Sequence, residues 1–308
     1  ALPAAFLMRP ELLSSVKDAV LATDGGSHAA LTSKKAKHKS AVHGMGGVGK
    51  TTAAVALAND KEVRAAFEKI LWVSVGQEPN VRELQGSLLH QGNKLKLSAE
   101  LTEKEATSQV KEATKGLKIL LVLDDVWESK YEKPLNVIDP DTPSKLLVTT
   151  RIRGLVKGAA EVDVGSLSES EALDLLAATA GIDTESWDEE EGTRGLALEV
   201  VNMCGRLALT VAIAGGMISE AGGFDEQIVD LLREEGLQNQ DDEGGEGMTV
   251  EDRVIRSSLN MITKGGKKNN SEMTLSIFNL FAAFPEDIAV PLEVFSALST
   301  IITDAQEV

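Results

Sequence analysis

The chain of 308 residues contains a single cysteine, Cys204. One cysteine cannot form an internal disulfide bond, which suits a reducing compartment, and we therefore expect a cytoplasmic protein. Cys204 lies in an apolar helical context, which favours a small core residue over a nucleophile. Long apolar runs are also missing, since the longest nearly apolar stretch, Leu207 to Ile218, is too short to span a bilayer. The apolar segment Ala1–Met8 has no basic leader and no cleavage pattern after it, so we expect neither a signal peptide nor a membrane span.

Basic residues are few: 31 Lys and Arg stand against 48 Asp and Glu, which gives a formal net charge of −17. This balance disfavours broad binding to nucleic acid or to anionic membranes. One local basic group exists, and we interpret it as a solvated lead-in to the motif that follows it: Lys34, Lys35, Lys37 and Lys39. The acidic residues concentrate in 185–191 and 234–246, and the second stretch predicts a flexible linker because it cannot bury apolar surface.

Residues 44–51 read Gly-Met-Gly-Gly-Val-Gly-Lys-Thr, a complete G-x-x-x-x-G-K-[ST] phosphate loop. Glycine permits backbone conformations that a Cβ forbids, so the N–H groups of the loop can turn towards a polyphosphate. Lys50 is predicted to reach the β- and γ-phosphates, and the Thr51 hydroxyl to hold Mg²⁺. A helix predicted from Thr52 to Ala58 would point its N-terminus at the phosphates. The predicted phosphate-binding residues are Gly44, Met45, Gly46, Gly47, Val48, Gly49, Lys50, Thr51 and Thr52.

Two further apolar runs end in polar residues. Leu120–Trp127 reads as a buried parallel strand with carboxylates at its carboxyl end, where open α/β sheets bind ligands. Asp124 is predicted to hold Mg²⁺ through its water shell, and Asp125 to orient or deprotonate an attacking water. The run Lys145–Thr150 is followed by Arg151, whose fork of donors could touch a γ-phosphate. An ordinary acidic turn and a surface arginine in an ion pair are the alternatives.

The order of elements predicts the fold class. Strands at 39–43 and 71–75 alternate with helices at 81–91 and 101–114, with Gly116 as a C-terminal stop signal, which is typical of a parallel, doubly wound sheet. After Arg151 the pattern predicts helices only. A capping box of Ser168 and Glu171 opens the first of them, which runs through Leu176. Further helices are predicted at 195–203, 208–219, 225–234, 250–262, 273–283 and 292–302.

Several segments together resemble the NB-ARC domain of STAND-class signalling NTPases, found in plant disease-resistance proteins and apoptosis-activating factors. They are GMGGVGKTT at 44–52, ILWVSV at 70–75, LLVLDDVW at 120–127, LLVTTR at 146–151, LSESEALDLL at 167–176, CGRLALTV at 204–211 and FAAFPED at 281–287. The resemblance implies an α/β P-loop domain over residues 1–160, an all-α helical subdomain over 161–240 and a partial winged helix over 250–308.

The resemblance also implies a function, namely a switch that binds ADP or ATP with Mg²⁺. ADP would hold the αβ and helical units closed, exchange for ATP would permit self-association, and hydrolysis would be slow at most. Arg9 matches a family arginine near the adenine, with an exposed arginine as the alternative. Leu207 and Ala208 match the Gly-Leu-Pro-Leu segment, where alanine replaces the proline that packs on the base or ribose, so affinity could be lower.

The resemblance leaves parts of the family unaccounted for. The family's Met-His-Asp triplet does not occur, the chain starts with Ala, and no sensor repeats are visible. We therefore expect a fragment whose sensor or effector domains lie elsewhere.

Two other classes of function stay open. One is a turnover ATPase or a small-molecule kinase. Steady-state hydrolysis at a rate in the typical enzymatic range would favour this class. The other is a STAND-type transcription regulator that binds DNA through its winged helix, against which the acidic balance and the absence of Lys/Arg clustering in 271–308 argue. A small GTPase is disfavoured because neither an Asn-Lys-x-Asp motif nor a D-x-x-G after Asp124 occurs.

Overall fold

The computed structural model describes residues 2–3, 5–22, 39–98, 100–184 and 192–224, together with the short pieces 229–230, 232–233, 254–255 and 293–294. The chain divides into two compact units. The first consists of Ala1–Ala4 and Met8–Gly165, and the second of Ala5–Leu7 and Ser166–Val308.

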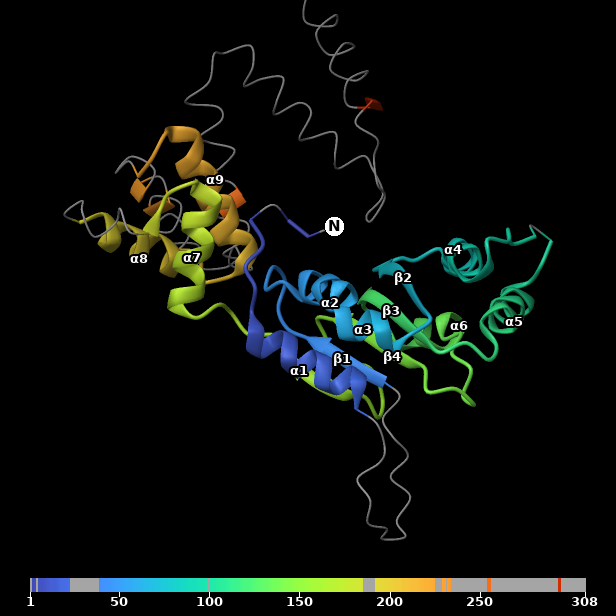
Figure 1. Ribbon diagram of the computed structural model, residues 1–308. Helices are drawn as coiled ribbons and strands as arrows, with labels where there is room; N and C mark the ends of the chain where they lie inside the picture. The colour runs from blue at the N-terminus through green and yellow to red at the C-terminus, as the bar shows by residue number, and fades with distance from the viewer. Residues whose placement is uncertain are drawn as a thin grey trace, which may run out of the picture. The chain divides into compact units, whose positions relative to one another are not determined.

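The first unit is built on a five-stranded parallel sheet with the strand order β2-β3-β4-β1-β5 (Figure 1). Its strands are β1 (Lys39–His43), β2 (Lys69–Gly76), β3 (Ile119–Val126), β4 (Lys145–Thr150) and β5 (Ala160–Asp163). The central strands β3 and β4 are almost wholly buried, as their uninterrupted apolar runs predict for strands covered on both faces. The predicted parallel α/β fold is confirmed.

Strand β5 corrects the sequence prediction, which placed only helices after Arg151. It pairs in parallel with β1 at the edge of the sheet. Its four residues alternate between half-buried and exposed positions, and the exposed ones are Glu161 and Asp163. A strand this short, with two carboxylates among four residues, has no apolar run by which sequence alone could recognise it.

Six helices surround this sheet in the part of the first unit that the structure describes: α1 (Pro10–Leu21), α2 (Lys50–Asn59), α3 (Lys61–Ala66), α4 (Val81–Asn93), α5 (Glu103–Thr114) and α6 (Glu132–Leu135), the last preceded by a 3₁₀ turn at Ser129–Tyr131. Helix α1 packs on β1 and β5, α2 on β3 and β4, and α4 on β2 (Figure 1). Gly116, at φ 73°, ends α5 as expected. The short helices α3 and α6 were not predicted, because one turn or so carries no periodicity.

The outer edge of β2 is covered by a side chain rather than by another strand. The Gln91 amide of α4 accepts a hydrogen bond from the backbone N–H of Trp72 and donates one to its carbonyl oxygen, both at 2.8 Å. The amide thereby takes the place of a neighbouring strand at this point, which protects an otherwise unpaired edge.

The second unit contains α7 (Glu169–Ala180), α8 (Thr193–Met203) and α9 (Ala208–Ala221). Ser168 and Glu171 form the predicted capping box of α7, with both reciprocal hydrogen bonds present. The apolar faces of the three helices meet in one core, in which Cys204 is fully buried, as expected of a small core residue. Helices α7 and α9 approach closely at Gly215, which lies against Thr179.

The remaining sequence predictions fall mainly outside the described residues. These are the helices at 250–262, 273–283 and 292–302, most of the helix at 225–234, the acidic stretches 185–191 and 234–246, and Lys34, Lys35 and Lys37. The domain boundaries and the partial winged helix stay predictions. Within the described residues, no helix combines the length and apolar character needed to cross a membrane.

Candidate functional site

Residues 44–49 join the carboxyl end of β1 to the first turn of α2, and the loop depends on its glycines. Gly44, Gly47 and Gly49 have φ angles of 153°, 66° and 98°, which L residues with side chains rarely adopt. A Cβ at Gly44 would lie 2.4 Å from the carbonyl oxygen of Val164, just after β5. The loop is therefore closely fitted to the edge of the sheet at its start, while Gly49 supplies the left-handed turn into α2.

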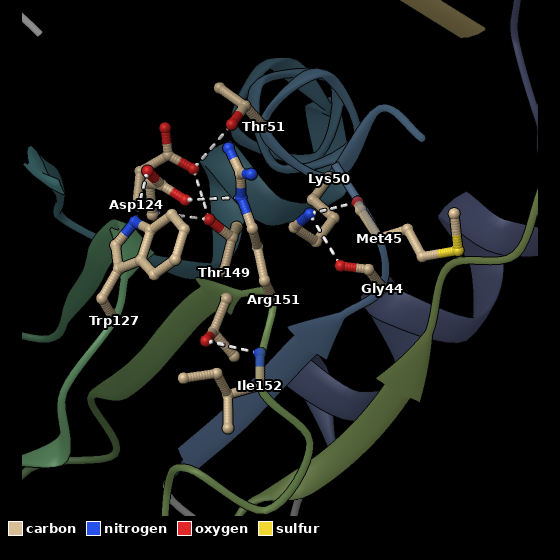
Figure 2. Close-up of polar contacts among 11 residues, drawn as sticks. Gly44, Met45, Lys50, Thr51, Asp124, Trp127, Thr149, Arg151 and Ile152 are labelled. Carbon is tan, nitrogen blue, oxygen red and sulfur yellow. Dashed lines mark hydrogen bonds and ion pairs between the residues drawn. The ribbon is translucent and has the colours of Figure 1, made fainter. Parts of the chain in front are cut away.

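The Lys50 side chain folds back across the loop. Its ammonium group donates hydrogen bonds to the carbonyl oxygens of Gly44 at 2.9 Å and Met45 at 2.6 Å (Figure 2). Lys50 is only 8% exposed, and burial, followed by the charge of Arg151, lowers the pKa of its ammonium group. A buried cation whose charged form is disfavoured in this way gains strongly from a bound anion. The loop and Lys50 thus fit a phosphate group.

Asp124 is a buried carboxylate at the end of β3, 4% exposed. Its Oδ1 accepts a hydrogen bond from the Thr51 hydroxyl at 3.0 Å and another from the Thr149 hydroxyl at 2.5 Å. Hydroxyl and carboxylate oxygens are the donors that Mg²⁺ prefers, and this ion usually takes only one or two ligands from the protein. The donor set of Thr51 and Asp124 therefore fits Mg²⁺.

Asp125, the next residue, is held in an unusual conformation with φ 53°. Its backbone N–H donates to the Thr149 hydroxyl at 2.8 Å, and its carboxylate accepts a hydrogen bond from the Trp127 indole N–H at 2.9 Å. Arg151 completes the group: its Nε lies 3.9 Å from Asp125 Oδ1, and its guanidinium carbon lies 4.7 Å from the centre of the Trp127 ring (Figure 2). A left-handed non-glycine residue held by several partners is typical of functional sites.

The structure brings together the residues predicted around the phosphates: Lys50 and Thr51 from α2, Asp124 and Asp125 from β3, and Arg151 after β4. Figure 2 labels Lys50, Thr51, Asp124 and Arg151. Of the other loop residues, Met45 is 64% exposed and Val48 is buried. Thr52 continues α2.

The residues predicted near the adenine belong to other elements of the chain. Arg9 precedes α1, and its guanidinium donates to the carbonyl oxygen of Gly165 at 3.3 Å. Leu207 and Ala208 belong to the second unit, where they begin α9 and Leu207 is buried. Their roles stay predictions.

Three residues of the site were missed by sequence reasoning. Thr149 binds both Asp124 and Asp125, and its only signal was a hydroxyl within a fully buried strand. Trp127 was seen as part of a motif but given no role. His43, at the end of β1, is buried, and its Nδ1 lies 3.3 Å from Asp163 on β5, a strand the sequence did not predict.

A parallel sheet that carries a phosphate loop after β1 and carboxylates at the end of β3, with β4 between the two strands, defines a P-loop NTPase. Within this class the chain belongs to the NB-ARC family, because the NB-ARC domain model matches residues 28–186. The resemblance found in the sequence is thereby confirmed.

Curated plant proteins are similar to the chain. Disease resistance protein RPS5 of Arabidopsis thaliana is 27% identical over 265 residues, which cover 82% of this chain and 28% of that protein. Disease resistance RPP13-like protein 4, also of Arabidopsis thaliana, is 27% identical over 183 residues, covering 57% and 21%. The chain thus spans less than a third of the length of either relative.

Among solved structures, one that is similar is a STAND (signal transduction ATPase with numerous domains) protein with a tetratricopeptide repeat sensor from Pyrococcus horikoshii. It shares 15% identity at a TM-score of 0.44 and covers 90% of this chain and 48% of its own.

Proposed function

We propose that this chain is the nucleotide-binding part of a signalling switch that binds ADP or ATP with Mg²⁺. The observation that carries the proposal is the convergence of a buried lysine, a hydroxyl–carboxylate pair and an arginine around one phosphate loop. Membership of the NB-ARC family supports a signalling role over a metabolic one.

Each residue has a proposed part in binding. The backbone N–H groups of residues 44–51 and the Lys50 ammonium group would hold the phosphates, and Arg151 would contact the third phosphate. Thr51 and Asp124 would hold Mg²⁺, which offsets phosphate charge when bound. Arg9, Leu207 and Ala208 would contribute to the recognition of the adenine and ribose.

We propose that hydrolysis is slow at most, because the Asp125 carboxylate already has partners. Its carboxylate already accepts the indole N–H of Trp127 and faces the Arg151 guanidinium. These two partners hold the carboxylate in one orientation, in which it could accept a hydrogen bond from a water molecule and so position it. Asp125 would therefore orient the attacking water rather than drive rapid turnover.

The switch itself requires that the two nucleotides favour different states of the protein, since a ligand shifts an equilibrium only through a difference in affinity. We propose that ADP favours a resting state and that exchange for ATP permits self-association. Sensor and effector domains elsewhere in a longer protein would supply the trigger and the output. A cytoplasmic location is part of this proposal.

The test is to purify the chain without added nucleotide, denature it and identify the released nucleotide by chromatography. Near-stoichiometric ADP is the expected result. A protein that carries no nucleotide and binds neither ADP nor ATP would refute the proposal, and steady-state turnover in the usual enzymatic range of about 1–10³ s⁻¹ would indicate a turnover ATPase instead.

Variants assign the roles. Lys50→Ala should abolish or strongly weaken binding of both nucleotides, whereas Lys111→Ala, on the surface of α5, should bind like the wild type. Asp125→Ala should slow single-turnover hydrolysis more than it weakens binding. Equal loss of both would place Asp125 with the metal.

A further inference from the structure

Trp127 joins Asp125, which the proposed function places at the attacking water, to Arg151, which it places at the third phosphate. Its indole N–H donates to Asp125 Oδ2 at 2.9 Å, and its ring faces the Arg151 guanidinium at 4.7 Å. Asp125 Oδ1 in turn lies 3.9 Å from Arg151 Nε. The three side chains therefore form a closed set of interactions, in which each one interacts with the other two. Figure 2 shows Trp127 and Arg151 side by side.

The Arg151 side chain needs these contacts to remain beside Lys50, because other forces favour its turning away. The charge of Arg151 lowers the pKa of the Lys50 ammonium group, so the two cations repel each other. The Arg151 side chain is 49% exposed and long enough to turn away into solvent. Its ion pair with Asp125 is too long for a hydrogen bond, and exposed pairs of this kind contribute little.

The Trp127 ring supplies the missing restraint. Tryptophan offers the strongest aromatic face for a guanidinium. The indole N–H also fixes the Asp125 carboxylate, whose backbone is held in a left-handed conformation by the Thr149 hydroxyl. Trp127 thus acts on Arg151 chiefly through its own ring and, more weakly, through the carboxylate that it orients.

We propose that Trp127 is a positioning residue that holds Arg151 beside Lys50 and thereby strengthens the binding of a nucleotide with a third phosphate. The inference rests on the proposed function. ADP lacks the group that Arg151 would contact, so the effect of Trp127 falls on ATP-type ligands alone. Pre-organised groups bind more tightly because less ordering remains to be done on binding.

The test compares the dissociation constants of Mg·ADP and Mg·ATPγS by calorimetry. Trp127→Leu should weaken ATPγS binding about 2- to 5-fold, the equivalent of one exposed cation–π contact, and leave ADP binding unchanged. Trp127→Phe keeps a ring but loses the N–H, and should fall between Leu and the wild type. Trp72→Leu, on β2, is the matched control and should change neither constant.

A double-mutant cycle separates positioning from a general loss of structure. If Trp127 acts through Arg151, Trp127→Leu should have no further effect on ATPγS binding in an Arg151→Gln background. Additive effects would overturn the proposal, as would an equal loss for ADP and ATPγS. A gain in ATPγS affinity would also overturn it, since the ring would then be holding Arg151 away from the phosphate.

Two outcomes distinguish this inference from the proposed function on which it rests. A wild-type chain that binds neither nucleotide overturns the proposed function, whereas unchanged ATPγS binding by Trp127→Leu overturns only the role of Trp127. The contact can also be tested without nucleotide, by the indole ¹⁵N–¹H resonances. Arg151→Gln should shift the Trp127 resonance and leave that of Trp72 in place, and an unmoved Trp127 resonance would refute the ring contact.

Discussion

Two neighbouring glycines in α9 should respond in opposite directions to the same substitution. Gly216 is exposed, and a Cβ there would meet nothing within 4 Å. A Cβ at Gly215 would lie 1.8 Å from the Thr179 hydroxyl oxygen, 2.7 Å from the Thr179 Cβ and 3.0 Å from the carbonyl oxygen of Leu176. Rotation of Thr179 could move its hydroxyl but not its Cβ, so relief requires α7 and α9 to separate.

The expected change in stability of each variant has two contributions. Replacing a glycine inside a helix by alanine stabilises it by about 1 kcal/mol, and both variants gain this equally. Overpacking costs about 1–3 kcal/mol or more, and only Gly215→Ala incurs it. Gly216→Ala should therefore stabilise α9 by about 1 kcal/mol. Gly215→Ala should be less stable than Gly216→Ala by about 1–3 kcal/mol. The gain in helix propensity does not affect this difference, because both variants share it.

Hydrogen exchange of peptides from α7 and α9, measured by mass spectrometry, is the appropriate assay. It reports the free energy of local opening, so it does not assume that a chain of two units unfolds in one step. Exchange in α9 should slow in Gly216→Ala and accelerate in Gly215→Ala, in α7 as well as in α9. If Gly215→Ala protects α9 as well as Gly216→Ala does, the close approach of the two helices is refuted.

Two titratable groups give further predictions. Burial and the charge of Arg151 lower the pKa of Lys50 from 10.5, so this side chain loses its charge at a lower pH than a free lysine does. ADP affinity should therefore be full below this pKa and fall as the pH rises through it. Lys50→Arg should show no such fall. The binding constant measured from neutral pH to pH 10.5, the ordinary pKa of lysine, checks this, and a wild-type profile that falls no more than that of Lys50→Arg would contradict it. Burial raises the pKa of the Cys204 thiol to about 12, so a thiol-specific disulfide reagent should leave the native protein unlabelled at pH 8 and label it fully after denaturation. Rapid labelling of native protein would show that the helical core is open.

Sequence reasoning succeeded where the signal was local. The apolar run of β3 identifies a buried strand by itself, and the capping box of Ser168 and Glu171 is formed by residues three apart. The phosphate loop is equally local, since its glycines, lysine and threonine are consecutive. Their convergence with Asp124 could be predicted because carboxyl ends of parallel strands share one edge.

Sequence reasoning failed where a structural feature depends on residues that are distant in the chain. Strand β5 exists because β1 offers it an edge, not because residues 160–163 favour extended backbone strongly. The bond of Thr149 to Asp124 requires that β3 and β4 be neighbours, which the chain order does not state. The stacking of Trp127 on Arg151 likewise joins two motifs that each appear complete alone.

An acidic chain can bind a polyphosphate because only the nearby charges matter. At physiological salt, charges more than about 8 Å apart in solvent are largely screened, so most of the net charge of −17 has little influence on the loop. At the site itself two cations, Lys50 and Arg151, stand against two carboxylates, Asp124 and Asp125. This local balance is neutral, and a bound polyphosphate would bring several negative charges close to both carboxylates. A divalent cation bound at the proposed site of Thr51 and Asp124 would offset that repulsion, and we therefore expect the affinity to depend on the metal rather than on the charge of the chain as a whole.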